Sequence, residues 1–105
     1  MREEIKNILS KITDFLKQDY NAQKVVLFGS YARGEENSDS DIDLFILAQT
    51  EKGFYRRIAD VKKSIRHLRN GLPISPIVLT PKELDSRKSI SDAFILEILE
   101  EGISL

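Results

Sequence analysis

The sequence predicts a small α/β domain in which helices pack on a mixed β-sheet of about four strands. Short runs rich in valine, isoleucine and leucine alternate with longer segments whose apolar residues recur every three or four positions. The chain has 105 residues, 41% hydrophobic and 31% charged, a composition typical of one globular domain. We therefore expect residues 1–105 to form a single domain.

The first half of the chain is expected to hold one long helix and two strands. Apolar residues from Ile5 to Leu16 share one helical face, and the run KVVLF stops at Gly29. The expected elements are a helix over 2–18, a strand over 24–28, a helical turn over 30–33, a polar loop over 34–40 and a strand over 42–48.

The second half is expected to add helices and two further strands. Pro76 lacks the N–H that a central strand needs, so its strand is expected to lie partly at an edge. The pattern predicts a helix near 53–69, a strand over 74–80, a helix start at 80–83, a last helix that ends at Gly102 and a short strand over 103–105. In this expected order, a single helix lies between the last two strands.

The overall charge argues against several classes of partner. There are 16 basic and 17 acidic residues, for a net charge of −1, so no bulk basic field attracts nucleic acid or a membrane surface. The chain has no cysteine, and we see neither a signal peptide nor a span long enough to cross a bilayer. We expect a cytoplasmic protein that does not bind nucleic acid directly.

Two aspartates stand out because they accompany an apolar strand. Side chains in a strand alternate faces, so Asp41 and Asp43 are expected to point the same way, roughly 7 Å apart. Like charges at this separation raise each other's pKa. Mg²⁺ is held by one or two carboxylates together with water and phosphate oxygens. A metal-bound phosphate therefore explains an acid in the middle of the strand.

A phosphate cradle is expected where the preceding strand ends. Gly29 allows a phosphate to approach the backbone, and the Ser30 hydroxyl can donate a hydrogen bond. Arg33 lies one turn further on and either contacts phosphate or braces the acidic loop. The two strands are expected to bring cradle and metal site to one end of the sheet.

The combined motif resembles a known family. Gly29-Ser30-x-Ala-Arg33-Gly, followed by Ser40-Asp41-x-Asp43-Leu, is similar to the signature of the DNA polymerase β nucleotidyltransferase superfamily, and the short chain resembles its minimal (MNT) members. The resemblance implies the polymerase-β-like nucleotidyltransferase fold and transfer of AMP from ATP. It implies that Asp41 and Asp43 are catalytic and hold Mg²⁺, two ions being expected. The nucleotide-binding residues that it implies are Gly29, Ser30, Arg33 and Ser40.

One position departs from the family pattern. The resemblance implies a third carboxylate on the next strand, where this sequence has Ser75 followed by Pro76. A serine neither replaces the charge of a carboxylate nor acts as a general base near neutral pH without a partner. Glu83 follows that strand, but we interpret it as an acid in the first turn of a helix.

The resemblance also implies a partner. Minimal nucleotidyltransferases are often encoded beside a helical HEPN-type protein and act as antitoxins, so we expect such a partner. The alternative is a binding module that retains the phosphate-binding residues, has lost catalytic activity and neutralises its partner by forming a complex with it. Association of identical chains is left open. A basic helical face is expected to be solvated, with an acidic partner or nucleic acid as the alternative: Arg56, Arg57, Lys62, Lys63, Arg66 and Arg69.

Overall fold

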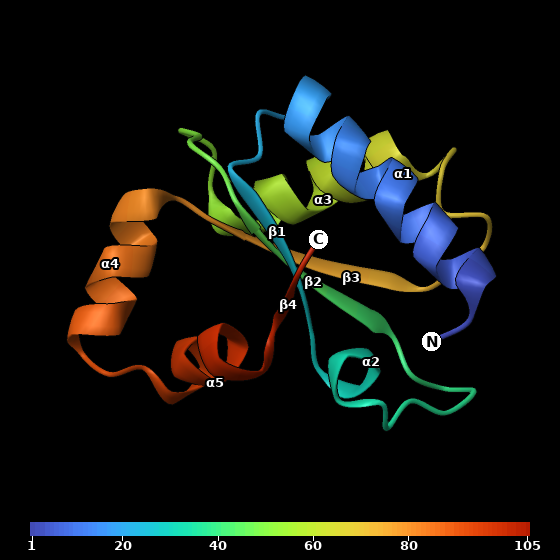
Figure 1. Cartoon of the computed structure of the whole chain (residues 1–105). Helices are drawn as coiled ribbons and strands as arrows, with labels where there is room; N and C mark the ends of the chain where they lie inside the picture. Colours follow the sequence, from blue (N-terminus) through green and yellow to red (C-terminus); the bar gives the residue numbers. More distant parts are fainter.

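The computed structural model describes all 105 residues as one sheet with helices on both faces. Helices α1 and α3 cover one face and α5 the other, with α4 beside α5 (Figure 1). The elements in chain order are α1 (Glu3–Asp19), β1 (Lys24–Phe28), α2 (Ser30–Arg33), β2 (Ile42–Leu47), α3 (Phe54–Ile65), β3 (Ile74–Leu79), α4 (Pro81–Ser89), α5 (Ala93–Glu101) and β4 (Ile103–Ser104). The predicted α/β class is confirmed.

The sheet is mixed, as the sequence predicts. Its strand order is β3-β2-β1-β4, in which β1 runs antiparallel to β2 and to β4, and β2 runs parallel to β3. The parallel pair requires a long crossover, and α3 provides it. Because β3 lies at the edge, Pro76 is tolerated within it.

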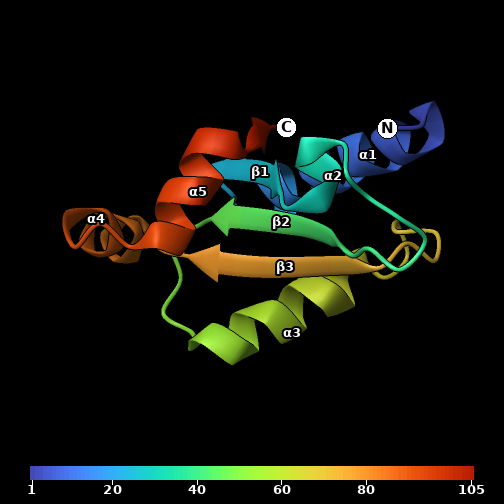
Figure 2. The ribbon, with the colours of Figure 1, turned by 90° about the horizontal axis from the view of Figure 1, so that it is seen from below.

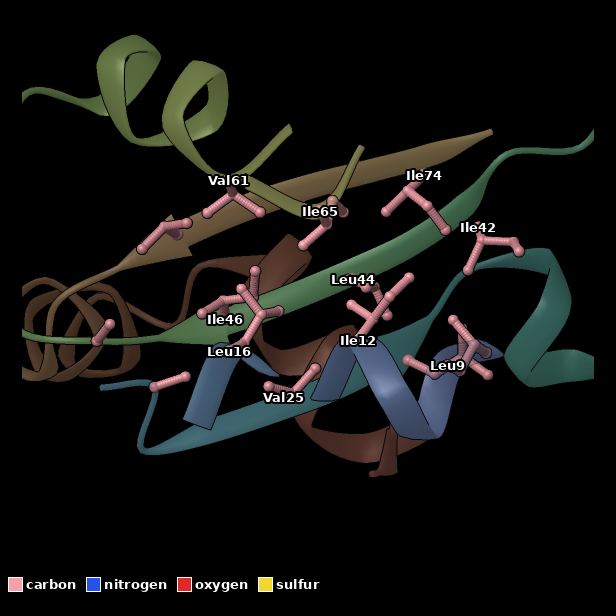
Figure 3. Packing of buried hydrophobic residues seen from close by; sticks show 14 of the residues in the cluster. Leu9, Ile12, Leu16, Val25, Ile42, Leu44, Ile46, Val61, Ile65 and Ile74 are labelled. Atoms are coloured by element: carbon pink, nitrogen blue, oxygen red, sulfur yellow. The ribbon is translucent and has the colours of Figure 1, made fainter. Parts of the chain in front are cut away.

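Both faces of β2 are buried. On the α1 and α3 face, Leu44 and Ile46 pack among side chains from both helices (Figure 3). On the opposite face, Phe45 packs with Ile95 and Ile98 of α5. A strand buried on both sides reads as a continuous apolar run. Asp43 is the only charged residue in this strand, and alternation places it on the same face as Phe45.

The structure differs from the expected order in one respect. Two helices, α4 and α5, stand where a single helix was expected between β3 and β4. The helical conformation is interrupted at Ser91, whose φ is +54°. Asp92 then caps α5 by accepting a hydrogen bond from the backbone N–H of Ile95 at 3.1 Å. None of the helices has the length and apolar composition needed to cross a membrane.

Candidate active site

The two strands that carry the motif place Asp43 at the centre of the candidate site. Asp43 of β2 lies opposite Phe28, the last residue of β1, and its neighbour on β3 is Ser75. Asp43 is half-buried in this position. Figure 2 shows α2, the loop that follows it and the starts of β2 and β3 at one end of the sheet. The register thus places the Gly29-Ser30 turn next to Asp43 at one end of the sheet, as the sequence predicts, and its binding of phosphate stays a prediction.

Gly29 lies directly against the Asp43 side chain. Its φ is +75°, a conformation that L-residues rarely adopt. A Cβ placed on Gly29 would overlap the Asp43 carboxylate. Glycine is therefore needed here for two separate reasons, and its absence of a side chain lets the turn into α2 pack on the acid.

The environment of Asp43 favours its uncharged form. Burial raises the pKa of its carboxyl group, and the negative charge of Asp41 raises that pKa further. The positive charge of Arg33 opposes this rise in pKa only in part. Ionisation of Asp43 is thus less favourable in the free protein than in water, and a cation bound beside it would offset this cost.

Asp41 lies just before β2 and is exposed. Strand alternation therefore does not set the direction of its side chain, contrary to the expectation that both acids belong to the strand. Its closeness to Asp43 is evident from its effect on the pKa of that residue. No group of three or more histidine, cysteine, aspartate or glutamate side chains is arranged so that it could hold a metal ion. The donor set of two carboxylates fits Mg²⁺, which completes its coordination with water and phosphate oxygens.

Ser30 opens α2 beside this acid pair. The backbone amides of Ala32 and Arg33 donate to the carbonyl of Gly29 at 3.1 and 3.2 Å, so they close the turn. The Ser30 side chain is half-buried and lies at the start of the helix, next to Gly29. The predicted contact of Ser30 with a phosphate stays a prediction.

Arg33 is held by acids from two parts of the chain. Its guanidinium lies 3.3 Å from Glu35, and 3.6 Å from both Glu97 and Glu101 of α5. Of the two roles that the sequence leaves open for Arg33, these contacts favour bracing α2 and the acidic loop. The part played by α5 was missed because these acids are far away in sequence. The only available signal is their spacing of four, which places both on one helical face.

Ser40 shapes the loop that leads to Asp41. Its hydroxyl accepts a hydrogen bond from the backbone of Asn37 at 2.9 Å and lies 3.4 Å from the side-chain oxygen of that residue. The Asn37 side chain also accepts from the backbone of Asp39 at 2.8 Å. Ser40 thus holds a compact turn, and its predicted contact with nucleotide stays a prediction.

Arg57 does not belong to the solvated basic face assigned to it from the sequence. Its side chain is 7% exposed and pairs with Glu83 at 2.6 Å. Arg57 also donates to the carbonyls of Lys52 and Val78 at 2.7 and 3.2 Å. Glu83 completes a capping box with Thr80 at the start of α4, so its interpretation as an acid in the first turn of a helix is confirmed.

Comparison with known proteins supports the class that the fold and site suggest. The sequence profile of the nucleotidyltransferase domain family matches residues 9–104. A protein of Methanocaldococcus jannaschii named "putative protein adenylyltransferase" is 33% identical over 100 residues, which cover 95% of this chain and 92% of that protein. A second protein of the same name and organism is 32% identical over 104 residues, covering 98% and 96% of the two chains.

A solved structure shows the same fold. The crystal structure of a protein from Sulfolobus solfataricus, described as a "putative nucleotidyltransferase", superposes with a TM-score of 0.64 at 20% identity and covers 96% of this chain and 78% of that one. The present chain belongs to the nucleotidyltransferase domain family. The predicted polymerase-β-like nucleotidyltransferase fold is thereby confirmed, and the reaction class of the family is transfer of a nucleotide.

Proposed function

We propose that this chain is a magnesium-dependent nucleotidyltransferase that transfers AMP from ATP to a hydroxyl group of a protein partner. The observation that carries the proposal is the half-buried Asp43 carboxylate, which lies against Gly29 and near the charge of Asp41. The names of the relatives as protein adenylyltransferases support AMP as the group transferred and protein as the acceptor.

Each motif residue has a defined part in this reaction. Asp41 and Asp43 would hold magnesium, and two ions are expected. Bound magnesium supplies charge neutralisation on the triphosphate and makes the attacking hydroxyl more acidic. Gly29 leaves room for a phosphate next to the backbone, and the Ser30 hydroxyl donates to a phosphate oxygen. Arg33 keeps α2 in place through its three acidic partners.

The transfer is an in-line displacement at phosphorus. The acceptor oxygen forms a bond to the α-phosphorus of ATP, and the bond from that phosphorus to the bridging oxygen breaks. Pyrophosphate leaves with the electron pair of the broken bond. The proton of the acceptor hydroxyl needs a base, and a serine hydroxyl is not one near neutral pH. Ser75 therefore leaves the proton to solvent or to a group that the partner supplies.

The proposed partner is a helical HEPN-type protein, with the present chain acting as its antitoxin. Asp41 is exposed and Asp43 is only half-buried, so an acceptor chain can reach a phosphate that is held beside them. A separate helical chain would supply the wall that encloses the acceptor hydroxyl.

A second candidate function is neutralisation of the partner by binding alone. The observation that favours it is Ser75, which the register places beside Asp43 where the family resemblance implies a carboxylate. In this case the chain binds nucleotide and partner without forming an adduct.

Two measurements test the proposal and separate it from the alternative. The first is the melting temperature with ATP, with and without Mg²⁺, which should rise only when both are present. The second is the intact mass of the neighbour-encoded partner after incubation with the chain, Mg²⁺ and ATP. An AMP adduct that disappears in Asp43→Asn supports the transferase. A stable complex without an adduct under any divalent metal supports the binding module and contradicts the transferase.

A further inference from the structure

A cavity of about 350 Å³ adjoins the candidate active site on the side of α3. Asp41 and Ser75 contribute to its wall, as do Ile65, Pro73 and Ile74. Three basic side chains complete the lining: Lys62, Arg66 and Arg69. Figure 2 shows why these segments meet, since the C-terminal end of α3 lies at the same end of the sheet as the starts of β2 and β3.

The positive charge in this cavity is not neutralised by the protein. Lys62 and Arg66 form no ion pair, and Arg69 donates to the backbone carbonyl of Leu72 at 2.9 Å. At the other end of α3 the arginines are paired, Arg56 with Asp60 at 3.1 Å and Arg57 with Glu83 at 2.6 Å. Unpaired cations therefore collect where α3 approaches Ser75, with the single carboxylate of Asp41 among them.

We propose that this cavity receives an acidic segment of the acceptor protein and places one of its carboxylates beside Ser75. The inference rests on the proposed transfer to a protein and specifies how that protein is recognised. Charge complementarity supports it, because three cations and one anion line the cavity.

The distribution of charge favours an acidic peptide over a nucleic acid. The chain as a whole has a net charge of −1, whereas nucleic-acid binding uses a basic surface that follows many phosphates. Here the unpaired positive charge is confined to one cavity, whose volume is near the lower end of the range of about 300–1,000 Å³ for small-molecule sites. A few acidic side chains fit this space and charge.

The proposal also accounts for Ser75. The cavity reaches Ser75, and Ser75 is the neighbour of Asp43 in the sheet. A carboxylate docked here would stand close to where a third acid is missing. It would accept the proton of the attacking hydroxyl, while the oxygen–phosphorus bond forms and pyrophosphate leaves. The acceptor thus brings the base that this chain lacks, and transfer depends on the presence of the correct partner.

The test uses the full chain and two fluorescein-labelled peptides of equal length. One carries a tyrosine flanked by glutamates, and the other carries a tyrosine flanked by glutamines. A labelled single-stranded RNA oligonucleotide is the third probe. Binding is measured by fluorescence anisotropy at low salt without ATP or metal. Arg66→Glu and Lys62→Glu reverse a positive charge of the cavity, and Lys63→Glu is the matched control, because Lys63 is an exposed lysine of α3 outside the cavity.

We expect the glutamate peptide to bind at least about tenfold more tightly than the glutamine peptide and the RNA. Arg66→Glu and Lys62→Glu should each weaken this binding about tenfold, and Lys63→Glu should change it less than about twofold. The proposal is overturned by equal binding of the two peptides, by preferential binding of RNA, or by an equal effect of Lys63→Glu.

A second measurement separates this inference from the proposed function. Stabilisation of Arg66→Glu by Mg²⁺ and ATP should equal that of the unaltered chain. Loss of this stabilisation in Arg66→Glu alone would assign the cavity to the nucleotide and overturn the docking proposal. If Mg²⁺ and ATP do not stabilise even the unaltered chain, the proposed nucleotide site is contradicted. The peptide measurement would still decide whether the cavity is a docking site.

Discussion

The two ends of β3 hold carboxylates under opposite conditions. At its start, Ser75 lies beside Asp43, whose half-buried carboxylate has another acid, Asp41, near it. At its end, roughly 16 Å away along the strand, Glu83 accepts hydrogen bonds from Arg57 at 2.6 and 3.2 Å and from the backbone of Thr80 at 2.8 Å. The first carboxylate is crowded by like charge, and the second is fully satisfied.

The pKa values of these two carboxyl groups shift in opposite directions. Burial and the charge of Asp41 raise the pKa of Asp43, whereas the hydrogen bond from Arg57 lowers the pKa of Glu83. A paired carboxylate stabilises the fold and has little to gain from a bound cation. An unpaired one destabilises the free protein and gains most from a bound cation. The comparison teaches that one end of β3 serves stability and the other serves binding.

The largest expected effect comes from removing the charge at the binding end. Asp43→Asn should lower adduct formation by about a thousandfold, because it removes a proposed magnesium ligand. The same change should not lower the melting temperature, because it also removes a repulsive charge. Intact mass spectrometry measures the adduct and circular dichroism the melting. Asp39→Asn, in the exposed loop, is the control and should keep activity. An active Asp43→Asn variant would refute the site.

The next effect concerns the stabilising end. Arg57→Ala should lower the free energy of unfolding by about 2–3 kcal/mol, because it removes a buried guanidinium and leaves Glu83 without its partner. This loss is smaller than the roughly 3–5 kcal/mol usual for a fully buried pair, because the Glu83 side chain is 42% exposed. Urea denaturation measures the change. Stabilisation by Mg²⁺ and ATP should persist, which would separate the two ends functionally.

The control for this variant is Arg56→Ala. Arg56 lies next to Arg57 in the chain and pairs with Asp60, but its side chain is 71% exposed. Its loss should cost less than about 1 kcal/mol. If both variants destabilise the protein equally, the burial of Arg57 is not what stabilises this end.

A smaller effect is expected at the contact between Gly29 and Asp43. Gly29→Ala should destabilise the fold by about 2 kcal/mol, because it combines an unfavourable backbone conformation with overlap on the Asp43 carboxylate. It should also weaken stabilisation by Mg²⁺ and ATP. Gly53→Ala is the control, since Gly53 has no positive φ and no atom within 4 Å of an added Cβ. Thermal melting with and without ligand measures both effects, and a fully stable Gly29→Ala would contradict the described contact.

The smallest effect is a difference in pH dependence. The raised pKa of Asp43 means that ionised Asp43 destabilises the fold at neutral pH, and this cost shrinks as pH falls from the raised pKa to below the ordinary aspartate pKa. The lowered pKa of Glu83 means that its stabilising contribution is present at neutral pH and is lost as pH falls through the lowered pKa.

This difference is measured by the melting temperatures of the unaltered chain, Asp43→Asn and Glu83→Gln as a function of pH. Asp43→Asn should be more stable than the unaltered chain near pH 7, and the difference should begin to shrink while pH is still above the ordinary aspartate pKa of about 3.9 and be lost once pH is below it. Glu83→Gln should be less stable near pH 7, and its difference should vanish only below the ordinary glutamate pKa of about 4.3. Vanishing in the reverse order would contradict the comparison.

Local sequence patterns predict most of the fold and the centre of the site. Helix and strand periodicity is a property of neighbouring residues, so the segments of α1, β1, β2 and β3 follow from it directly. The break at Ser91 was missed because its φ of +54° departs from any helical or strand pattern. An acid inside the apolar run IDLFIL points to Asp43 without any knowledge of the fold.

The sequence by itself determined the α/β class, the mixed sheet and the cluster of Gly29, Ser30, Asp41 and Asp43, because these depend on alternation and short spacing. Only the tertiary structure decided which charges are paired. Arg57 and Glu83 are 26 positions apart, and Arg33 reaches acids of α5 that follow in the chain by more than sixty residues. The cavity beside Ser75 likewise forms only when α3 packs against β3. Burial and charge pairing depend on distant segments meeting in space, and no local pattern encodes that meeting.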